Sequence, residues 1–234
     1  MRKWCLIIVL ILLIPQAGCA ESVISADYPI DLPVETKYIA LTFDDGPKAG
    51  TTDRLLDGLK ERGASATFFL VGEWGTNNRD LVRRMQEEGH QVGNHTWSHV
   101  RLEGADYDEL LEEIERNEKL LRDILGGENY WLRPPYGAIE EELTDQIRVP
   151  MIKWSVDPRD WESRDRDSIV AAILREVRPN SIVLLHDIYP SSVEAALEVV
   201  DTLQKQGYWF VTVEELLYLN GIQPQAGVMY RFGE

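Results

Sequence analysis

The sequence predicts an α/β fold in which parallel strands alternate with helices and close into an incomplete (β/α)7 barrel. Short apolar runs of strand length recur along the chain, and longer stretches with helical periodicity lie between them. Such alternation implies parallel strands joined by right-handed crossovers. Polar residues follow several of the apolar runs, at the strand ends where barrel enzymes place their active sites. A chain of 234 residues is long enough for one well-buried domain of this kind.

The candidate strands are short and mostly apolar. In chain order they are Tyr38–Phe43, Ala66–Val71, His90–Asn94, Tyr130–Arg133, Met151–Val156, Ser181–His186 and Trp209–Thr212.

The candidate helices separate these strands. They are Thr51–Arg62, Arg79–Glu88, Tyr107–Leu125, Asp167–Val177 and Ser191–Gln206. The third has the clearest pattern, because Leu110, Ile114 and Leu121 recur at helical spacing and acidic residues occupy the other side. We interpret that acidic side as a solvated face.

The N-terminal segment resembles an export signal. Arg2 and Lys3 precede an apolar run, Trp4–Ile14, that is too short to span a membrane and suits the apolar part of a signal peptide. Small residues around Cys19 suit cleavage, and Cys19 could be lipidated, although Gln16 stands where lipoprotein signals usually carry Leu. The sequence leaves three forms of the protein open: a lipoprotein, a secreted protein and, thirdly, a protein held by an uncleaved anchor. Each places the domain outside the cytoplasm, secreted or lipid-anchored at a bacterial cell envelope.

We therefore expect a signal over residues 1–20, a linker over 21–37, a catalytic domain over 38–220 and a tail over 221–234. Both cysteines, Cys5 and Cys19, precede the catalytic domain, so that domain has no internal disulfide.

The net charge of −16 argues against nucleic acid or an anionic membrane surface as the main partner. A neutral glycan held by aromatic stacking fits better, and seven tryptophans supply the rings. Simple solubility also accounts for the charge. We expect membrane contact only through the N-terminal anchor or lipid, and a monomer.

Two motifs suggest a metal site. Asp44 and Asp45 end an apolar strand just before Gly46 and Pro47, and desolvated carboxylates need a metal, a cation or a proton. At the end of a strand both can face one cavity, one binding a metal while the other removes a proton. His95 and His99 have an i, i+4 spacing that would put both rings on one face of a helical turn. Two histidines and one carboxylate form the ligand set of a catalytic zinc.

Three further motifs follow apolar runs. They are Arg133-Pro134-Pro135-Tyr136-Gly137, Asp157-Pro158-Arg159-Asp160-Trp161, and His186-Asp187. Together the five segments TFDDGP, HTWSH, RPPYG, DPRDW and LLHD resemble, in order and residue type, the polysaccharide deacetylase family, the NodB-homology domain of carbohydrate esterase family 4. The similarity runs from about Tyr38 to about Leu219 and implies a distorted barrel of the NodB type.

The resemblance also implies residue roles. Asp45, His95 and His99 would bind a divalent metal, most plausibly zinc, with cobalt or another ion as alternatives. Asp44 would be the general base, Arg133 would orient it, and His186 would be the general acid. Asp160, or failing that Asp157, would orient His186. The backbone N–H of Tyr136 would hold the oxyanion, and Pro135, Tyr136, Trp161 and Leu184 would contact substrate. We assign no role to His90.

The expected activity is metal-dependent hydrolysis of the acetamide of N-acetylglucosamine units in an extracytoplasmic glycan, peptidoglycan or chitin-like. One alternative is an O-acetyl esterase acting on a polymer such as xylan, which would use the same site. The other is a glycan-binding pseudoenzyme, which loss of Asp44, Asp45, His95, His99 or His186 would signal; all five are present.

Overall fold

The computed structural model describes residues 36–104 and 106–234. The expected signal segment, Cys19 and nearly all of the expected linker lie outside the described residues. Within the described part, no helix combines the length and the apolar character that crossing a bilayer requires.

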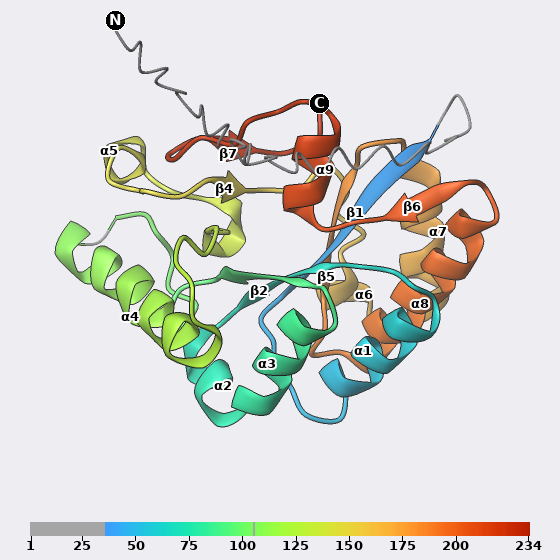
Figure 1. The fold of residues 1–234 in the computed structure, drawn as a ribbon, viewed down its shortest axis with the longest axis horizontal. Coiled ribbons are helices and arrows are strands. Elements are labelled where there is room, and N and C mark those ends of the chain that lie inside the picture. The colour runs from blue at the N-terminus through green and yellow to red at the C-terminus, as the bar shows by residue number, and fades with distance from the viewer. Residues whose placement is uncertain (1–35, 105) are drawn as a thin grey trace, which may run out of the picture. The chain divides into compact units, whose positions relative to one another are not determined.

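Five parallel strands form the main sheet. They are β1 (Lys37–Asp44), β2 (Thr67–Leu70), β3 (Gln91–Asn94), β5 (Ile182–His186) and β6 (Tyr208–Phe210). The hydrogen-bonded order is β3-β2-β1-β5, and β6 pairs with the amino-terminal part of β1. A second, two-stranded parallel sheet joins β4 (Met151–Ile152) to β7 (Met229–Tyr230) (Figure 1).

Single bridges connect the two sheets. Leu132 bridges Asn94 on one side and Met151 on the other, and Val156 bridges Val183 of β5. These links close the strands into a distorted barrel, as the sequence predicts.

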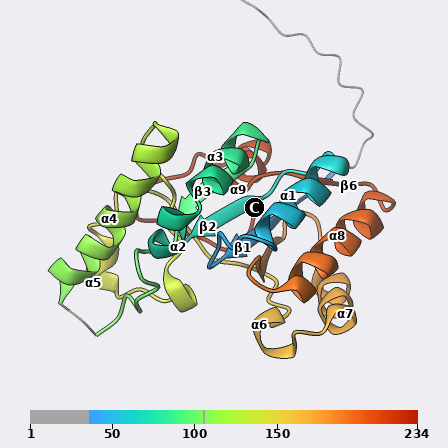
Figure 2. The ribbon, with the colours of Figure 1, turned by 90° about the horizontal axis from the view of Figure 1, so that it is seen from below.

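Helices surround this barrel. They are α1 (Thr52–Glu61), α2 (Gly72–Asn77), α3 (Arg79–Glu87), α4 (Tyr107–Leu125), α5 (Glu141–Thr144), α6 (Asp160–Ser163), α7 (Arg166–Glu176), α8 (Pro190–Gln204) and α9 (Val213–Leu219), with a 3-10 turn η1 (Pro135–Gly137). Figure 2 shows α4 and α5 on one side and α6, α7 and α8 on the other.

The predicted strands and helices differ from the structure in a few places. Tyr130–Arg133 forms only a bridge at Leu132, because Pro134 and Pro135 follow and prolines interrupt strand pairing. The strand predicted over Met151–Val156 ends at Ile152, and the chain then changes partner from β7 to β5. The expected tail, residues 221–234, contains β7. The patterns also missed α2, α5, α6 and α9, of which all but α9 are six residues or shorter.

The two faces of β1 explain how the strand positions polar residues. Ile39, Leu41 and Phe43 are fully buried in the cluster that includes residues of the outer helices α1 and α8. Ala40 belongs to a second cluster with Phe69 and Ile152 of other barrel segments. Because side chains alternate along a strand, Thr42 and Asp44 share the face of Ala40 and point toward the barrel interior.

Candidate active site

The carboxyl ends of the barrel strands bring the predicted residues together. The parallel register pairs Asp44 of β1 with His186 of β5, and β3 ends at Asn94, directly before His95. Asp44, Asp45, His95, His99 and His186 all line one cavity of about 330 Å³.

Asp45, His95 and His99 form a candidate metal site. One ligand atom from each residue lies within 4.8 Å of the others. Asp45 Oδ1 is 3.6 Å from His95 Nε2 and 3.4 Å from His99 Nε2, and it is buried without a hydrogen-bond partner among the described residues. Ligand atoms about 2.0–2.1 Å from a tetrahedral zinc lie roughly 3.4 Å apart, so the spacing of these atoms fits such an ion.

The backbone that carries these ligands is not helical. The sequence interpretation of residues 95–99 as a helical turn is wrong: Thr96 (φ 65°) and His99 (φ 63°) adopt left-handed conformations in a loop. Asp45 is also left-handed, with φ 71°. Residues other than glycine rarely adopt a left-handed backbone conformation. Three of them in one site persist because the surrounding structure holds them in place.

A buried pair of asparagines fixes the histidine loop. Asn94 accepts a hydrogen bond from the Thr96 N–H at 2.9 Å, and Asn117 of α4 donates to the carbonyls of Thr96 (2.9 Å) and Leu70 (2.7 Å). Asn117 Nδ2 also donates to Asn94 Oδ1 at 2.9 Å. Sequence reasoning missed Asn117, although an asparagine among the apolar positions of an amphipathic helix is a signal that could have found it.

A backbone carbonyl orients His95. Its Nδ1 lies 2.7 Å from the carbonyl oxygen of Arg133, which can only accept, so Nδ1 carries the proton and Nε2 carries the lone pair that a metal needs.

Arg133 and Asp44 form a fully buried ion pair. Arg133 Nη1 donates to Asp44 Oδ1 and to Thr42 Oγ1, both at 2.7 Å, and Nη2 and Nε donate to the carbonyls of Lys153 (3.1 Å) and Ile152 (3.3 Å). The guanidinium also stacks on Phe69 at 4.2 Å. Burial lowers the pKa of Arg133, and the charge of Asp44 opposes that shift. These contacts hold Asp44 in one rotamer and leave Oδ2 on the side of His95 Nε2, 3.6 Å away.

Asp160, and not Asp157, contacts His186. Asp160 is fully buried and accepts from His186 Nδ1 and the His186 backbone N–H, both at 2.8 Å. Ser192 of α8, which sequence reasoning missed, donates to the same carboxylate at 2.6 Å. Burial of His186 favours its neutral form, but the hydrogen bond and charge of Asp160 outweigh burial and raise the pKa of His186 to about 9.

Aromatic and apolar residues complete the cavity wall. Tyr136, Trp161 and Leu184, which the sequence predicts to contact substrate, line the cavity, and Trp154 and Asp157 line it in addition. Pro135 is buried and does not line it. Tyr136 (φ 60°) sits edge-on to the His99 ring at 4.8 Å.

Asp187, next to His186, packs behind the Asp45 turn. It is fully buried, accepts a hydrogen bond from Thr52 Oγ1, and lies against Gly46, where an added Cβ would come within 2.3 Å of its carboxylate. Burial raises the pKa of Asp187 to about 7. Its contacts support the turn rather than reach the cavity.

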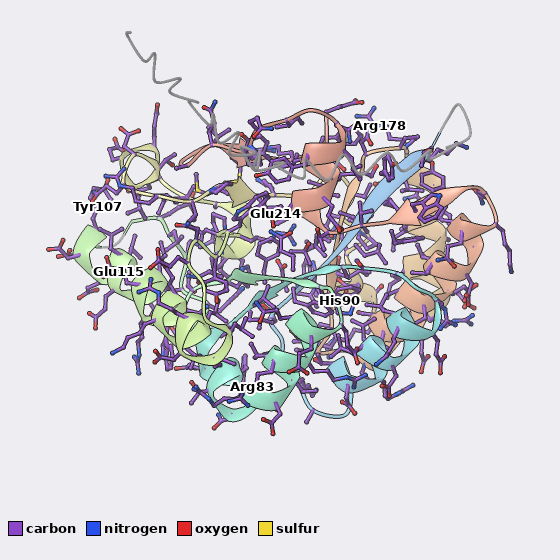
Figure 3. All side chains as sticks on the ribbon, in the orientation of Figure 1. Arg83, His90, Tyr107, Glu115, Arg178 and Glu214 are labelled. Atoms are coloured by element: carbon purple, nitrogen blue, oxygen red, sulfur yellow. The ribbon has the colours of Figure 1, made fainter. Side chains whose placement is uncertain are left out.

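A larger and more open hollow of about 740 Å³ lies at the opposite, amino-terminal ends of the strands. His90 and Glu214, both labelled in Figure 3, contribute to its lining. His90 is buried, accepts a hydrogen bond from the Ala66 N–H at 3.2 Å, and has a pKa lowered to about 4 by burial. We therefore assign the chemistry to the smaller cavity, where the acids and histidines converge.

Comparisons with known proteins identify the family of the chain. The family model described as polysaccharide deacetylase matches residues 31–149. The chain is 41% identical over 180 residues to the peptidoglycan-N-acetylmuramic acid deacetylase PdaC of Bacillus subtilis, covering 77% of this chain and 38% of that protein. It is 39% identical over 194 residues to the peptidoglycan-N-acetylglucosamine deacetylase PgdA of Listeria monocytogenes, covering 83% of this chain and 41% of that protein. The chain thus spans about two fifths of the length of these relatives.

A solved structure gives the same result for the fold. The family 4 acetyl xylan esterase of Clostridium thermocellum, solved with a cobalt ion, superposes with a TM-score of 0.79 at 32% identity, covering 84% of this chain and 98% of that one. From its motifs, its barrel and these matches, the chain belongs to the polysaccharide deacetylase family.

Proposed function

We propose that this protein is a metal-dependent polysaccharide N-deacetylase that hydrolyses the acetamide of N-acetylglucosamine units in peptidoglycan or a chitin-like glycan outside the cytoplasm. One observation carries the proposal. Around a single cavity the chain assembles a three-ligand metal site, a carboxylate held by a buried arginine, and a histidine held by a buried carboxylate.

The metal site fits a catalytic ion. Asp45, His95 and His99 would hold zinc, or cobalt in its place, and a bound ion of this kind polarises a carbonyl and lowers the pKa of a bound water. Three protein ligands leave room for that water and for the acetyl oxygen.

Asp44 and His186 divide the proton transfers. Asp44 accepts the proton of the attacking water at Oδ2, while Arg133 holds Oδ1 and fixes the rotamer. His186 is protonated at neutral pH, because its pKa is raised, and donates its Nε2 proton to the departing sugar amine. Asp160 holds Nδ1 and so aims Nε2 at the cavity.

The remaining walls position the acetyl group. The backbone N–H of Tyr136 would stabilise the tetrahedral oxyanion, and Trp161 and Leu184 would enclose the acetyl methyl. Tyr136 is also 55% exposed, so the part of its ring that Arg101 and His99 leave uncovered can contact sugar beside the cavity.

The test is acetate release from N-acetylglucosamine oligomers by the full chain, first stripped of metal and then given zinc. We expect zinc-dependent release that Asp44→Asn abolishes, whereas Asp80→Asn, which alters a surface carboxylate, keeps it. Metal analysis separates the roles, since Asp44→Asn should retain zinc and His95→Ala should lose it. A zinc-free Asp44→Asn would contradict the division between base and ligand.

The second candidate function is O-acetyl esterase activity, which the similarity to the acetyl xylan esterase favours. Ester and amide hydrolysis pass through similar tetrahedral intermediates and would use the same residues. Release of acetate from acetylxylan, with none from N-acetylated oligomers, would select the esterase. Binding of glycans without release from either would select a pseudoenzyme.

A further inference from the structure

Cationic side chains gather along one wall of the candidate active site, in a chain whose net charge is −16. The wall is the Tyr136–Gly137 turn, and the cations are Arg101, Lys153 and Arg231, which we call the cationic rim.

The β4–β7 pairing brings two of these cations together. The parallel register matches Met151 with Met229 and Ile152 with Tyr230, and the Lys153 N–H donates to the Tyr230 carbonyl at 2.7 Å. Lys153 and Arg231 are therefore the next residues of two paired strands and lie side by side. Burial and the like charge of Arg231 lower the pKa of Lys153.

Lys153 reaches the wall of the cavity directly. A Cβ added at Gly137 would lie 2.7 Å from Lys153 Cε and 2.8 Å from the Trp154 ring, so the lysine stem packs on the turn. Trp154 and Tyr136 both line the catalytic cavity. The lysine stem therefore packs beside two residues of the cavity wall, although Lys153 itself does not line the cavity.

Arg101 extends the rim on the other side of the turn. Its guanidinium stacks on the Tyr136 ring at 4.2 Å, and the same ring contacts His99 of the candidate metal site edge-on at 4.8 Å. Glu103 pairs with Arg101 at 3.1 Å, but both side chains are about half exposed, and such a pair exchanges readily with a ligand. Within residues 36–104 and 106–234, neither Lys153 nor Arg231 has a carboxylate within ion-pair distance.

Glu103 is the acid near these cations: it pairs with Arg101, and its charge opposes the lowered pKa of Lys153. Three cations around that carboxylate leave an excess of positive charge, which favours an anionic ligand. We propose that the cationic rim binds carboxylates of the substrate, so that the enzyme acts on an acidic N-acetylated glycan in preference to a neutral one. The proposal rests on the proposed deacetylase function and departs from the neutral glycan that net charge suggested. Carboxylates of this kind occur in muramic acid, as the lactyl group, and in peptides attached to it.

The experiment compares matched glycans with the zinc-loaded full chain. One substrate is a tetrasaccharide of alternating N-acetylglucosamine and N-acetylmuramic acid with free lactyl carboxylates, and its partner carries the same carboxylates as methyl esters. A peptide-bearing version and neutral N-acetylated chitotetraose complete the set. The readout is kcat/KM for acetate release.

We expect the wild type to prefer the free carboxylate over its ester, and the preference to shrink as salt is raised. Each of Arg231→Gln and Lys153→Met should reduce the preference by about 1.4- to fivefold, the range for one exposed ion pair. Arg83→Gln is the matched control. Arg83 lies on α3 (Figure 3), pairs with Asp80 at 2.7 Å and does not line the cavity, so its loss should leave the preference unchanged.

The outcomes are distinct. The wild type could prefer only the peptide-bearing glycan over chitotetraose. If the rim variants lose that preference, the result supports a rim that binds carboxylates of the peptide. The rim is overturned if the free acid and its ester have equal kcat/KM and the peptide-bearing glycan is not preferred over chitotetraose. It is also overturned if both rim variants retain the preference. Absence of acetate release from all four substrates overturns the proposed function itself.

Discussion

The buried Arg133–Asp44 pair gives a sharp prediction about stability. Arg133→Met keeps an unbranched side chain of similar length and removes the guanidinium that makes four hydrogen bonds to Thr42, Asp44, Ile152 and Lys153. Asp44 is 3% exposed, so its carboxylate would stay buried without its cation. Removing one partner of a buried pair costs about 3–5 kcal/mol, a large share of the roughly 5–15 kcal/mol that holds a domain folded.

The assay is urea denaturation of the metal-free protein, followed by the fluorescence of its tryptophans. Arg62→Met is the matched control, because Arg62 makes a two-bond contact to Asp201 at 2.8 and 2.9 Å, but the Asp201 side chain is 46% exposed. Its loss should cost about 1 kcal/mol or less.

A double variant separates loss of the pair from loss of packing. In Arg133→Met with Asp44→Asn neither charge remains, so its destabilisation should be smaller than the sum of the two single changes by more than 1 kcal/mol. If Arg133→Met costs no more than Arg62→Met, or if the two single changes simply add, the ion pair is not what holds these side chains in place.

Three further changes test other parts of the structure. Asp160→Asn removes the contact that raises the pKa of His186, so the alkaline limb of the kcat profile should move to lower pH; an unmoved limb would show that His186 is not the acid. Burial lowers the pKa of His90 from 6.5 to about 4, so between these values the unfolded chain binds a proton that the folded chain does not. The wild type should therefore lose up to about 3 kcal/mol of unfolding free energy as pH falls from 6.5 to 4, a loss that His90→Gln should lack when both are titrated with urea. Gly72→Ala would place a Cβ 2.5 Å from the Trp97 ring and 2.9 Å from Asn117 Oδ1, and should lower the unfolding free energy by about 1–3 kcal/mol; an unchanged urea midpoint would mean that this contact relaxes freely.

Much of the site could be predicted because its chemistry is local in sequence. Each motif places its polar residues where an apolar run ends, so alternation and strand length sufficed to place Asp44, His95 and His186 at one edge of the barrel. The residues that hold these groups were harder to find. Asn117 and Ser192 lie on helices far along the chain, and their contacts depend on how α4 and α8 pack against the strands.

The sequence patterns also failed to predict the backbone conformation of the candidate metal site. The i, i+4 histidine spacing is compatible with a helical turn and equally with the loop that forms. A local hydrogen bond to Asn94 and a tertiary one from Asn117 stabilise the loop. The sequence patterns also failed to predict β7, because a strand of two residues is too short to show alternation of polar and apolar side chains.

Strand register is what joins these local motifs into one site. Asp44 pairs with His186 on one neighbouring strand and with Phe69 on the other, and Arg133 stacks on that Phe69 while it binds Asp44. Side chains alternate along a strand, so a slip of β1 by one residue would place Phe43 opposite Arg133 and turn Asp44 toward the helices. That slip would bury a carboxylate among the apolar residues that now surround Phe43 and leave the Arg133 charge unpaired. The same ion pair that orients the proposed base therefore also penalises the wrong register, which ties the geometry of the site to the correct folding of the barrel.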